Sequence, residues 1–246
     1  MLYIIGLRIY EERDMSLKAL AALKKCKKIY AEFYTSPIKV DLKELEKLAG
    51  KKVEVLERKQ VEEESMIIDS AAKTDTAFIA GGDALSATTH IDLAMQCRKK
   101  GIVVRIIHGS SIFSAVAECG LQLYKFGRTV SLPYPKENYF PESPYENIMM
   151  NVKAGLHTLL LLDIGMKASE AMDVLAALEK RIGGKILTEN TKIVVAAHLG
   201  ATLGATIKYG RIKDMKYMDF GELPHTIVIP GKLHFAEEEY LDLFAK

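Results

Sequence analysis

Residues 76–90 read TAFIAGGDALSATTH, and this stretch decides the fold class. The apolar run Thr76–Ala80 predicts a buried strand. Two glycines and Asp83 follow it directly, and a helix is expected over residues 88–100, closed by Gly101. A strand, a glycine turn and a helix in this order are typical of one unit of a parallel sheet.

The same alternation of strand and helix continues on both sides of this stretch. Residues 1–120 therefore predict a mostly parallel sheet with helices on both faces, and residues 121–246, richer in successive strands, predict an α+β domain. The fold class expected is α/β with two domains. Further strands are expected over residues 1–7, 28–33, 53–56, 103–107, 156–164, 192–197, 205–209 and 225–230, and helices over 16–24, 41–50, 62–73, 111–119, 145–154, 169–182 and 236–245.

Composition gives no support to several classes of protein. With 34 basic and 32 acidic residues the net charge is +2, which gives no strong field to attract a nucleic acid. No apolar run approaches the ~20 residues that span a bilayer, so no membrane association is expected. The three cysteines form no CxxC pair and are expected to be buried free thiols, as in a cytoplasmic protein.

The turn Gly81-Gly82-Asp83 is a candidate ligand loop. Open α/β sheets bind ligands at the carboxyl ends of their strands. Glycines there let the backbone approach a ligand, and amides at a helix start attract negative charge. A carboxylate in such a turn also accepts from hydroxyls or pairs with an ammonium. The alternative, that Asp83 only caps a turn, stays equally open on these residues.

Two further strand ends have the same character. The run 108–112, His-Gly-Ser-Ser-Ile, follows an apolar strand, although Ser111 would also serve as an ordinary helix cap. The third is the first turn, residues 6–9, which contains no second glycine. Because neither GxGxxG nor GxxxxGK[ST] occurs, nicotinamide dinucleotide and P-loop nucleotide sites are not expected.

Other polar residues favour structural roles. The six histidines show no spacing typical of a metal site, so no metal is expected. His157 and His225 each begin an apolar strand and are expected to be core or capping residues. The acidic run Glu237-Glu238-Glu239 is expected to be the solvated start of a helix.

Taken in order along the chain, these segments resemble the tetrapyrrole-methylase-like methyltransferases, and within them the branch that acts in diphthamide biosynthesis. The resemblance covers nearly the whole chain and is carried by the order and spacing of many short segments. They are residues 5–7, 16–18, 30–36, 82–83, 87–90, 111–112, 114–116, 120–124, 156–164, 219–221, 224–225 and 229–234.

The resemblance implies a two-domain homodimer, with domains 1–120 and 121–246 and the cofactor in the cleft between them. It implies S-adenosyl-L-methionine as cofactor and S-adenosyl-L-homocysteine as its product. The implied protein substrate is translation elongation factor 2, whose 3-amino-3-carboxypropyl-histidine is methylated successively on the amine to give diphthine. The cofactor contacts implied are Ile9, Asp83, Ser86, Ser111, Ile112, Leu162, Leu199 and His225.

This chemistry needs neither a metal nor a covalent nucleophile, because a sulfonium methyl group is already activated. The amine must be neutral to attack, and no residue is assigned as the base. Two alternatives remain: a methyltransferase of the same fold acting on a corrin-type ring, and a non-catalytic binding or interaction module.

The sequence departs from the family pattern at four places, one of which is a stretch after Asp163-Ile164 that is shorter than usual. Arg8 stands where a second glycine is usual, so its side chain either points outward or weakens cofactor binding. Ala84 replaces a proline after Asp83. Residues 197–201, Ala-His-Leu-Gly-Ala, replace an Ala-Arg-Ala-Gly-Ser pattern, which puts a contact on the acceptor side in doubt at His198.

Overall fold

The computed structural model describes residues 1–11, 14–36 and 40–245. The chain divides into two compact units, Met1–Ala115 (unit 1) and Val116–Lys246 (unit 2), and each is described by itself.

Unit 1 is built on one parallel sheet of five strands in the order β3-β2-β4-β1-β5. The α/β fold class expected from the sequence is therefore confirmed. The elements are β1 (Leu2–Gly6), α1 (Leu17–Lys25), β2 (Lys28–Glu32), α2 (Leu42–Ala49), β3 (Glu54–Val55), α3 (Arg58–Glu62), α4 (Met66–Lys73), β4 (Thr76–Ala80), α5 (Ile91–Lys99), β5 (Val104–Ile107) and α6 (Ile112–Ala115).

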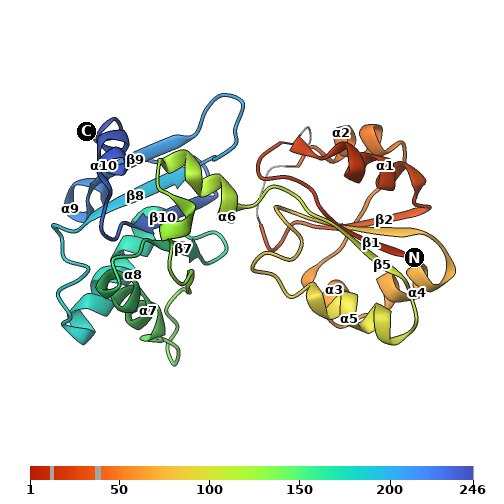
Figure 1. Ribbon diagram of the computed structural model, residues 1–246. Coiled ribbons are helices and arrows are strands. Elements are labelled where there is room, and N and C mark those ends of the chain that lie inside the picture. The colour runs from red at the N-terminus through yellow and green to blue at the C-terminus, as the bar shows by residue number, and fades with distance from the viewer. Residues whose placement is uncertain (12–13, 37–39, 246) are drawn as a thin grey trace. The chain divides into compact units, whose positions relative to one another are not determined.

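The central strands are apolar throughout because both faces of the sheet are covered. Successive side chains of β1 point to opposite faces. Tyr3 and Ile5 belong to the core under α1 and α2, whereas Leu2 and Ile4 pack with residues of α3, α4 and α5. Figure 1 shows these two groups of helices on opposite faces of the sheet.

Local capping explains where several helices begin and end. The Ser16 hydroxyl accepts from the Ala19 amide at 3.1 Å and starts α1. One carboxylate oxygen of Asp41 accepts from two amides at the start of α2, and Gly50 ends that helix in the left-handed conformation, with φ of 70°.

Two helix predictions were wrong in detail. The helix expected over residues 62–73 begins instead at Met66 as α4, and a separate short helix that was not predicted, α3, precedes it and ends at Glu62. The helix expected from Thr88 begins instead at Ile91, because the Thr88 hydroxyl and His90 Nδ1 both bond to the Ala84 carbonyl and hold residues 84–90 in a compact turn.

Unit 2 contains a mixed sheet of five strands in the order β6-β7-β10-β8-β9, in which only the β6–β7 pair is parallel. Its elements are η2 (Val116–Cys119), η3 (Leu123–Lys125), β6 (Val130–Leu132), α7 (Ser143–Lys153), β7 (Thr158–Leu162), α8 (Ala168–Ile182), β8 (Lys192–Ala197), β9 (Thr206–Arg211), α9 (Ile212–Met215), β10 (His225–Ile229) and α10 (Phe235–Asp242). Leu160, Val195 and Ile227 of this sheet share a core with α7 and α8.

Helix α10 is fixed to the rest of unit 2 by a buried carboxylate, Glu237, which is only 1% exposed. Glu237 accepts hydrogen bonds from the Gln122 amide at 2.9 Å, the His234 amide at 2.8 Å and His157 Nε2 at 3.1 Å, and it pairs with Lys125 Nζ. The expectation that the acidic run is solvated was therefore wrong for Glu237, since donors from distant segments converge on it.

His157, which completes this Glu237 cluster, is fully buried, as the sequence predicted for a core histidine. Its Nδ1 accepts from the Gly231 amide at 2.9 Å, so Nε2 carries the proton that is donated to Glu237. Burial lowers the pKa of His157, and the ring is neutral in this arrangement.

Within the described residues, no helix is both long enough and apolar enough to span a membrane.

Candidate active site

The carboxyl ends of β4, β1 and β5 lie next to one another, because these strands are adjacent and parallel in the sheet. The loop after each strand therefore emerges at the same edge. These three strand-end loops, residues 7–10, 81–90 and 108–111, form the candidate site.

Three glycines allow the backbones of these loops to touch. A Cβ atom on Gly6 would lie 2.6 Å from the Gly109 nitrogen and 2.7 Å from the Gly82 oxygen, closer than carbon atoms pack. Gly82 itself has φ of +67°, and its amide donates to the Arg8 carbonyl at 2.6 Å. Side chains are thus excluded from this contact, and the backbones of the three loops pack directly against one another.

Substituting Gly109 with alanine is expected to force the loops apart. The new Cβ would lie 2.5 Å from the Gly82 oxygen and 2.7 Å from the Gly6 carbonyl carbon, and neither is a flexible side chain. We expect the free energy of unfolding to fall by about 1–3 kcal/mol in urea titrations. The neighbouring exposed Ser110, replaced by alanine, should leave it within about 0.5 kcal/mol. Equal stability of the two variants would contradict this packing.

Asp83 links two of the loops through four donors. One oxygen, Oδ1, accepts from the Leu85 amide at 3.0 Å and the Ser86 hydroxyl at 3.2 Å. The other, Oδ2, accepts from the Gly109 amide at 3.2 Å and from His108 Nδ1 at 2.8 Å. The side chain thus joins the loop after β4 to the loop after β5.

The electrostatics of Asp83 favour its ionised form. The side chain is 7% exposed, and burial by itself raises the pKa of a carboxyl group. Hydrogen bonds from the Leu85 amide, His108 and the Gly109 amide outweigh that effect and hold the pKa of Asp83 below its usual value. Asp83 is therefore a fixed negative charge beneath the loop surface.

His108 is a residue of the candidate site for which the sequence predicted no role. It is the first residue after β5, and its side chain is 73% exposed while its ring contacts the buried Asp83. The available signal was positional: Asp83 and His108 both follow buried parallel strands, separated in the sheet only by β1.

The predicted cofactor contacts of unit 1 all lie on or beside these loops. Ile9, half-buried, follows β1, and Ser86 lies in the loop that contains Asp83. Ser111 and Ile112 stand at the start of α6, where the Ser111 carbonyl accepts from the amides of the next turn. The structure thus brings together the five predicted contacts of this unit.

The three predicted contacts of unit 2 also gather at one edge, that of the second sheet. Leu162 ends β7, His225 begins β10 opposite Ala197, and the buried Leu199 follows β8. His225 Nδ1 accepts from the Ala168 amide and its Nε2 donates to the Gly221 carbonyl, both at 3.2 Å.

Burial lowers the pKa of His225, so the ring is neutral. Because both of its ring nitrogens are engaged, His225 fixes the start of α8 and leaves neither nitrogen available to a ligand.

The structure places each of the residues Arg8, Ala84 and His198, which depart from the family pattern. Arg8 is 1% exposed and its guanidinium donates to the Tyr10 carbonyl, so the side chain does not point outward. Ala84 is buried, with its carbonyl bonded within the loop. His198 adopts a left-handed conformation, with φ of 54°, in the loop before Leu199.

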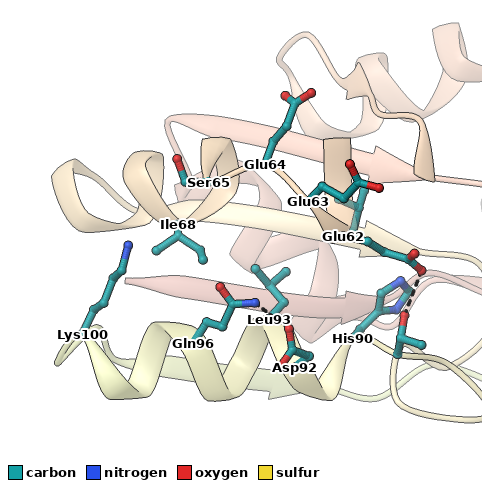
Figure 2. Close-up of a pocket in the computed structure, with 12 residues that line it drawn as sticks. Glu62, Glu63, Glu64, Ser65, Ile68, His90, Asp92, Leu93, Gln96 and Lys100 are labelled. Carbon is teal, nitrogen blue, oxygen red and sulfur yellow. Dashed lines mark hydrogen bonds between the residues drawn. The ribbon is translucent and has the colours of Figure 1, made fainter. Parts of the chain in front are cut away.

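A pocket of about 340 Å³ lies among α3, α4 and α5 and is lined by acidic, polar and apolar side chains. Figure 2 shows Glu62 and His90 near one end of it and Lys100 at the other. The eight predicted cofactor contacts are absent from its lining, and Thr89 and His90, at the end of the loop 81–90, are the residues that it shares with the strand-end loops. In the part of the chain that is described, no three His, Cys, Asp or Glu residues are placed to hold a metal ion.

Comparison with known proteins identifies the class to which this fold and site belong. Residues 1–215 match the model of the tetrapyrrole (corrin/porphyrin) methylases. The chain belongs to this family, and it is a methyltransferase, which requires a methyl donor.

Individual relatives narrow the class further. The diphthine synthase of Methanocaldococcus jannaschii is 49% identical, covering 98% of this chain and 97% of the relative. That of Methanococcus maripaludis is 45% identical over the same shares. A crystal structure of a diphthine synthase superimposes with a TM-score of 0.88 at 32% identity, covering 100% of this chain and 96% of the other. The family resemblance, the fold and the enzyme class predicted from the sequence are confirmed.

Proposed function

We propose that this methyltransferase acts in diphthamide biosynthesis, transferring methyl groups from S-adenosyl-L-methionine to the amine of 3-amino-3-carboxypropyl-histidine in translation elongation factor 2. Successive transfers give diphthine and release S-adenosyl-L-homocysteine. The observation that carries the proposal is the 49% identity to a diphthine synthase along nearly the full length of both chains.

The strand-end loops suit this donor. The close backbone contact among Gly6, Gly82 and Gly109 holds the three loops together at one edge of the sheet, where ligands of open α/β sheets bind. In the proposal, Ile9, Asp83, Ser86, Ser111 and Ile112 hold the donor from domain 1–120. Leu162, Leu199 and His225 contribute contacts from domain 121–246.

When bound, the donor supplies a methyl group already activated by the positive sulfonium. The residues of the chain then have to bind, align and exclude water. Holding the two reacting groups in line can contribute roughly 7–11 kcal/mol to catalysis. The Asp83 carboxylate serves this end by keeping two of the loops in one arrangement through its four donors.

The proposal extends to the state of the protein in the cell. It acts as a homodimer in the cytoplasm, with elongation factor 2 as its protein partner and without binding nucleic acid or membrane. Free buried thiols at Cys26, Cys97 and Cys119 support a reducing compartment.

The test is incubation of the purified protein with methyl-labelled donor and elongation factor 2 that carries the carboxypropyl-histidine. We expect label on the factor and, by mass spectrometry, successive additions to the modified histidine. The same factor with unmodified histidine is the control and should stay unlabelled. Label on a corrin acceptor instead would favour the alternative substrate. Absence of donor binding in calorimetry would favour a non-catalytic module.

A further inference from the structure

His108 presents a free ring nitrogen that is oriented by a buried carboxylate. Ionised Asp83 can only accept hydrogen bonds, so the contact of 2.8 Å to its Oδ2 requires the proton on His108 Nδ1. In the neutral ring the lone pair is then on Nε2. Because 73% of the side chain is exposed, this lone pair is accessible to a ligand at the strand-end loops.

This arrangement is the one that enzymes use to prepare a histidine as a base. A carboxylate bound to Nδ1–H fixes the tautomer and stabilises the imidazolium that forms when Nε2 takes a proton. Asp83, 7% exposed and held ionised by its donors, meets both requirements.

The reaction proposed above requires such a group. An aliphatic amine is mostly an ammonium ion at neutral pH, and an ammonium has no lone pair with which to attack. His225 is unsuited to the task, because both of its ring nitrogens already bond to the backbone. We propose that His108 is the general base that deprotonates the substrate ammonium before each methyl transfer; this rests on the proposed function.

The step balances without a further reactant. His108 Nε2 takes one proton from the substrate ammonium, and the N–H electron pair becomes the amine lone pair. That lone pair forms the new N–C bond as the C–S bond breaks, with its electrons passing to sulfur. A secondary or tertiary ammonium produced in this way must lose its own proton before another transfer, so the base is required again in each round.

Exposure to solvent allows His108 to act again in the next round of methyl transfer. The imidazolium of His108 has to release its proton between rounds, and a ring that is largely exposed can pass it directly to water. The buried Asp83 keeps the ring in the same orientation throughout.

The decisive variant is His108→Asn. The asparagine amide can still donate to Asp83, so the link between the loops is retained while Nε2 is removed. With saturating donor in a single-turnover assay at neutral pH, we expect methyl transfer to elongation factor 2 to slow by about 10²- to 10⁴-fold. Calorimetry should show a donor Kd within about three-fold of the wild-type value.

Two further measurements separate a base from a structural residue. Free imidazole should restore part of the rate in His108→Gly, since the position is exposed. Nitrogen-15 NMR of labelled histidine, assigned by the signal missing in His108→Asn, should show the neutral ring protonated at Nδ1. The control His234→Asn alters an exposed histidine of unit 2 outside the candidate site and should keep the wild-type rate.

The outcomes are distinct. A slow His108→Asn enzyme with intact donor binding, together with rescue by imidazole, supports the proposal. A rate within about three-fold of wild type, a proton on Nε2 instead of Nδ1, or a parallel loss of donor binding overturns it. A wild-type protein that methylates no elongation factor overturns the proposed function as well.

Discussion

Replacing Glu237 with alanine is expected to lower the free energy of unfolding of unit 2 by about 3–5 kcal/mol, because it leaves a buried cationic and polar cluster without its carboxylate. His157, Lys125 and the Gln122 amide all donate to Glu237 and would lose their acceptor. Urea titration followed by circular dichroism measures the change.

Two comparisons test the origin of this effect. Glu239 lies on the same helix but is exposed, so Glu239→Ala should change the unfolding free energy by less than about 0.5 kcal/mol. Glu237→Gln keeps an oxygen acceptor without the charge, so its unfolding free energy should lie between those of Glu237→Ala and Glu239→Ala. A Glu237→Ala protein as stable as Glu239→Ala would contradict the role assigned to the Glu237 cluster.

The same carboxylate predicts a defined sensitivity to acid. Although burial opposes ionisation, hydrogen bonds from the His234 amide, Lys125, the Gln122 amide and His157 lower the pKa of Glu237 to about 2, from an ordinary value of 4.5. Its stabilising contribution is therefore complete above pH 4.5 and is lost as the pH falls toward 2. A shift of this size corresponds to about 3 kcal/mol, and Glu237→Ala should lack this part of the acid sensitivity.

Replacing Asp83 with alanine is expected to weaken binding of S-adenosyl-L-methionine by at least about 100-fold. The substitution removes the acceptor of four donors, two of which come from the loop after β5. Hydrogen bonds to a charged group contribute about 1.5–3 kcal/mol each. Losing the order of the two loops is therefore enough to weaken donor binding by a factor of about 100. Calorimetry with the donor and with S-adenosyl-L-homocysteine measures it.

The controls for this prediction isolate the site from the fold. Asp92→Ala removes an exposed carboxylate of α5, which follows the same loop, and should leave binding unchanged. Asp83→Asn has nearly the volume of the original residue and retains one acceptor oxygen, so it should fold and still bind poorly. Wild-type affinity in both Asp83 variants would remove Asp83 from the proposed donor site.

Much of the fold could be predicted because local patterns determine it. The strands Thr76–Ala80 and Lys192–Ala197 match their predicted bounds, since a short apolar run between turn residues has few other solutions. The break between α3 and α4 could not be seen in the same way. Val61 and Ile68 are both buried and seven residues apart, which is helical spacing, so periodicity does not reveal that residues 63–65 interrupt the helical structure.

The position of the candidate site could be predicted where its residues follow strand ends. It could not be predicted where it depends on contacts between residues far apart in the sequence. Glycines and Asp83 after a buried strand marked this turn as a candidate ligand loop, with a turn cap as the alternative. The roles of His108 and Glu237 depend on partners distant in sequence, 25 residues away for Asp83 and 80 for His157. Charge and hydropathy patterns do not report contacts across such separations, so no role was predicted for His108, and the acidic run that contains Glu237 was interpreted as solvated.

The order of the two units along the chain has a consequence for synthesis on the ribosome. All five strands of the parallel sheet are encoded before residue 116, so unit 1 can complete its core while the rest of the protein is still being made. Unit 2, by contrast, cannot complete its contacts before the end of the chain has been made. Until α10 has emerged, a nascent chain carries Lys125 and His157 with no carboxylate to bury them against, and it would be in this interval that unit 2 depends most on protection from misassembly.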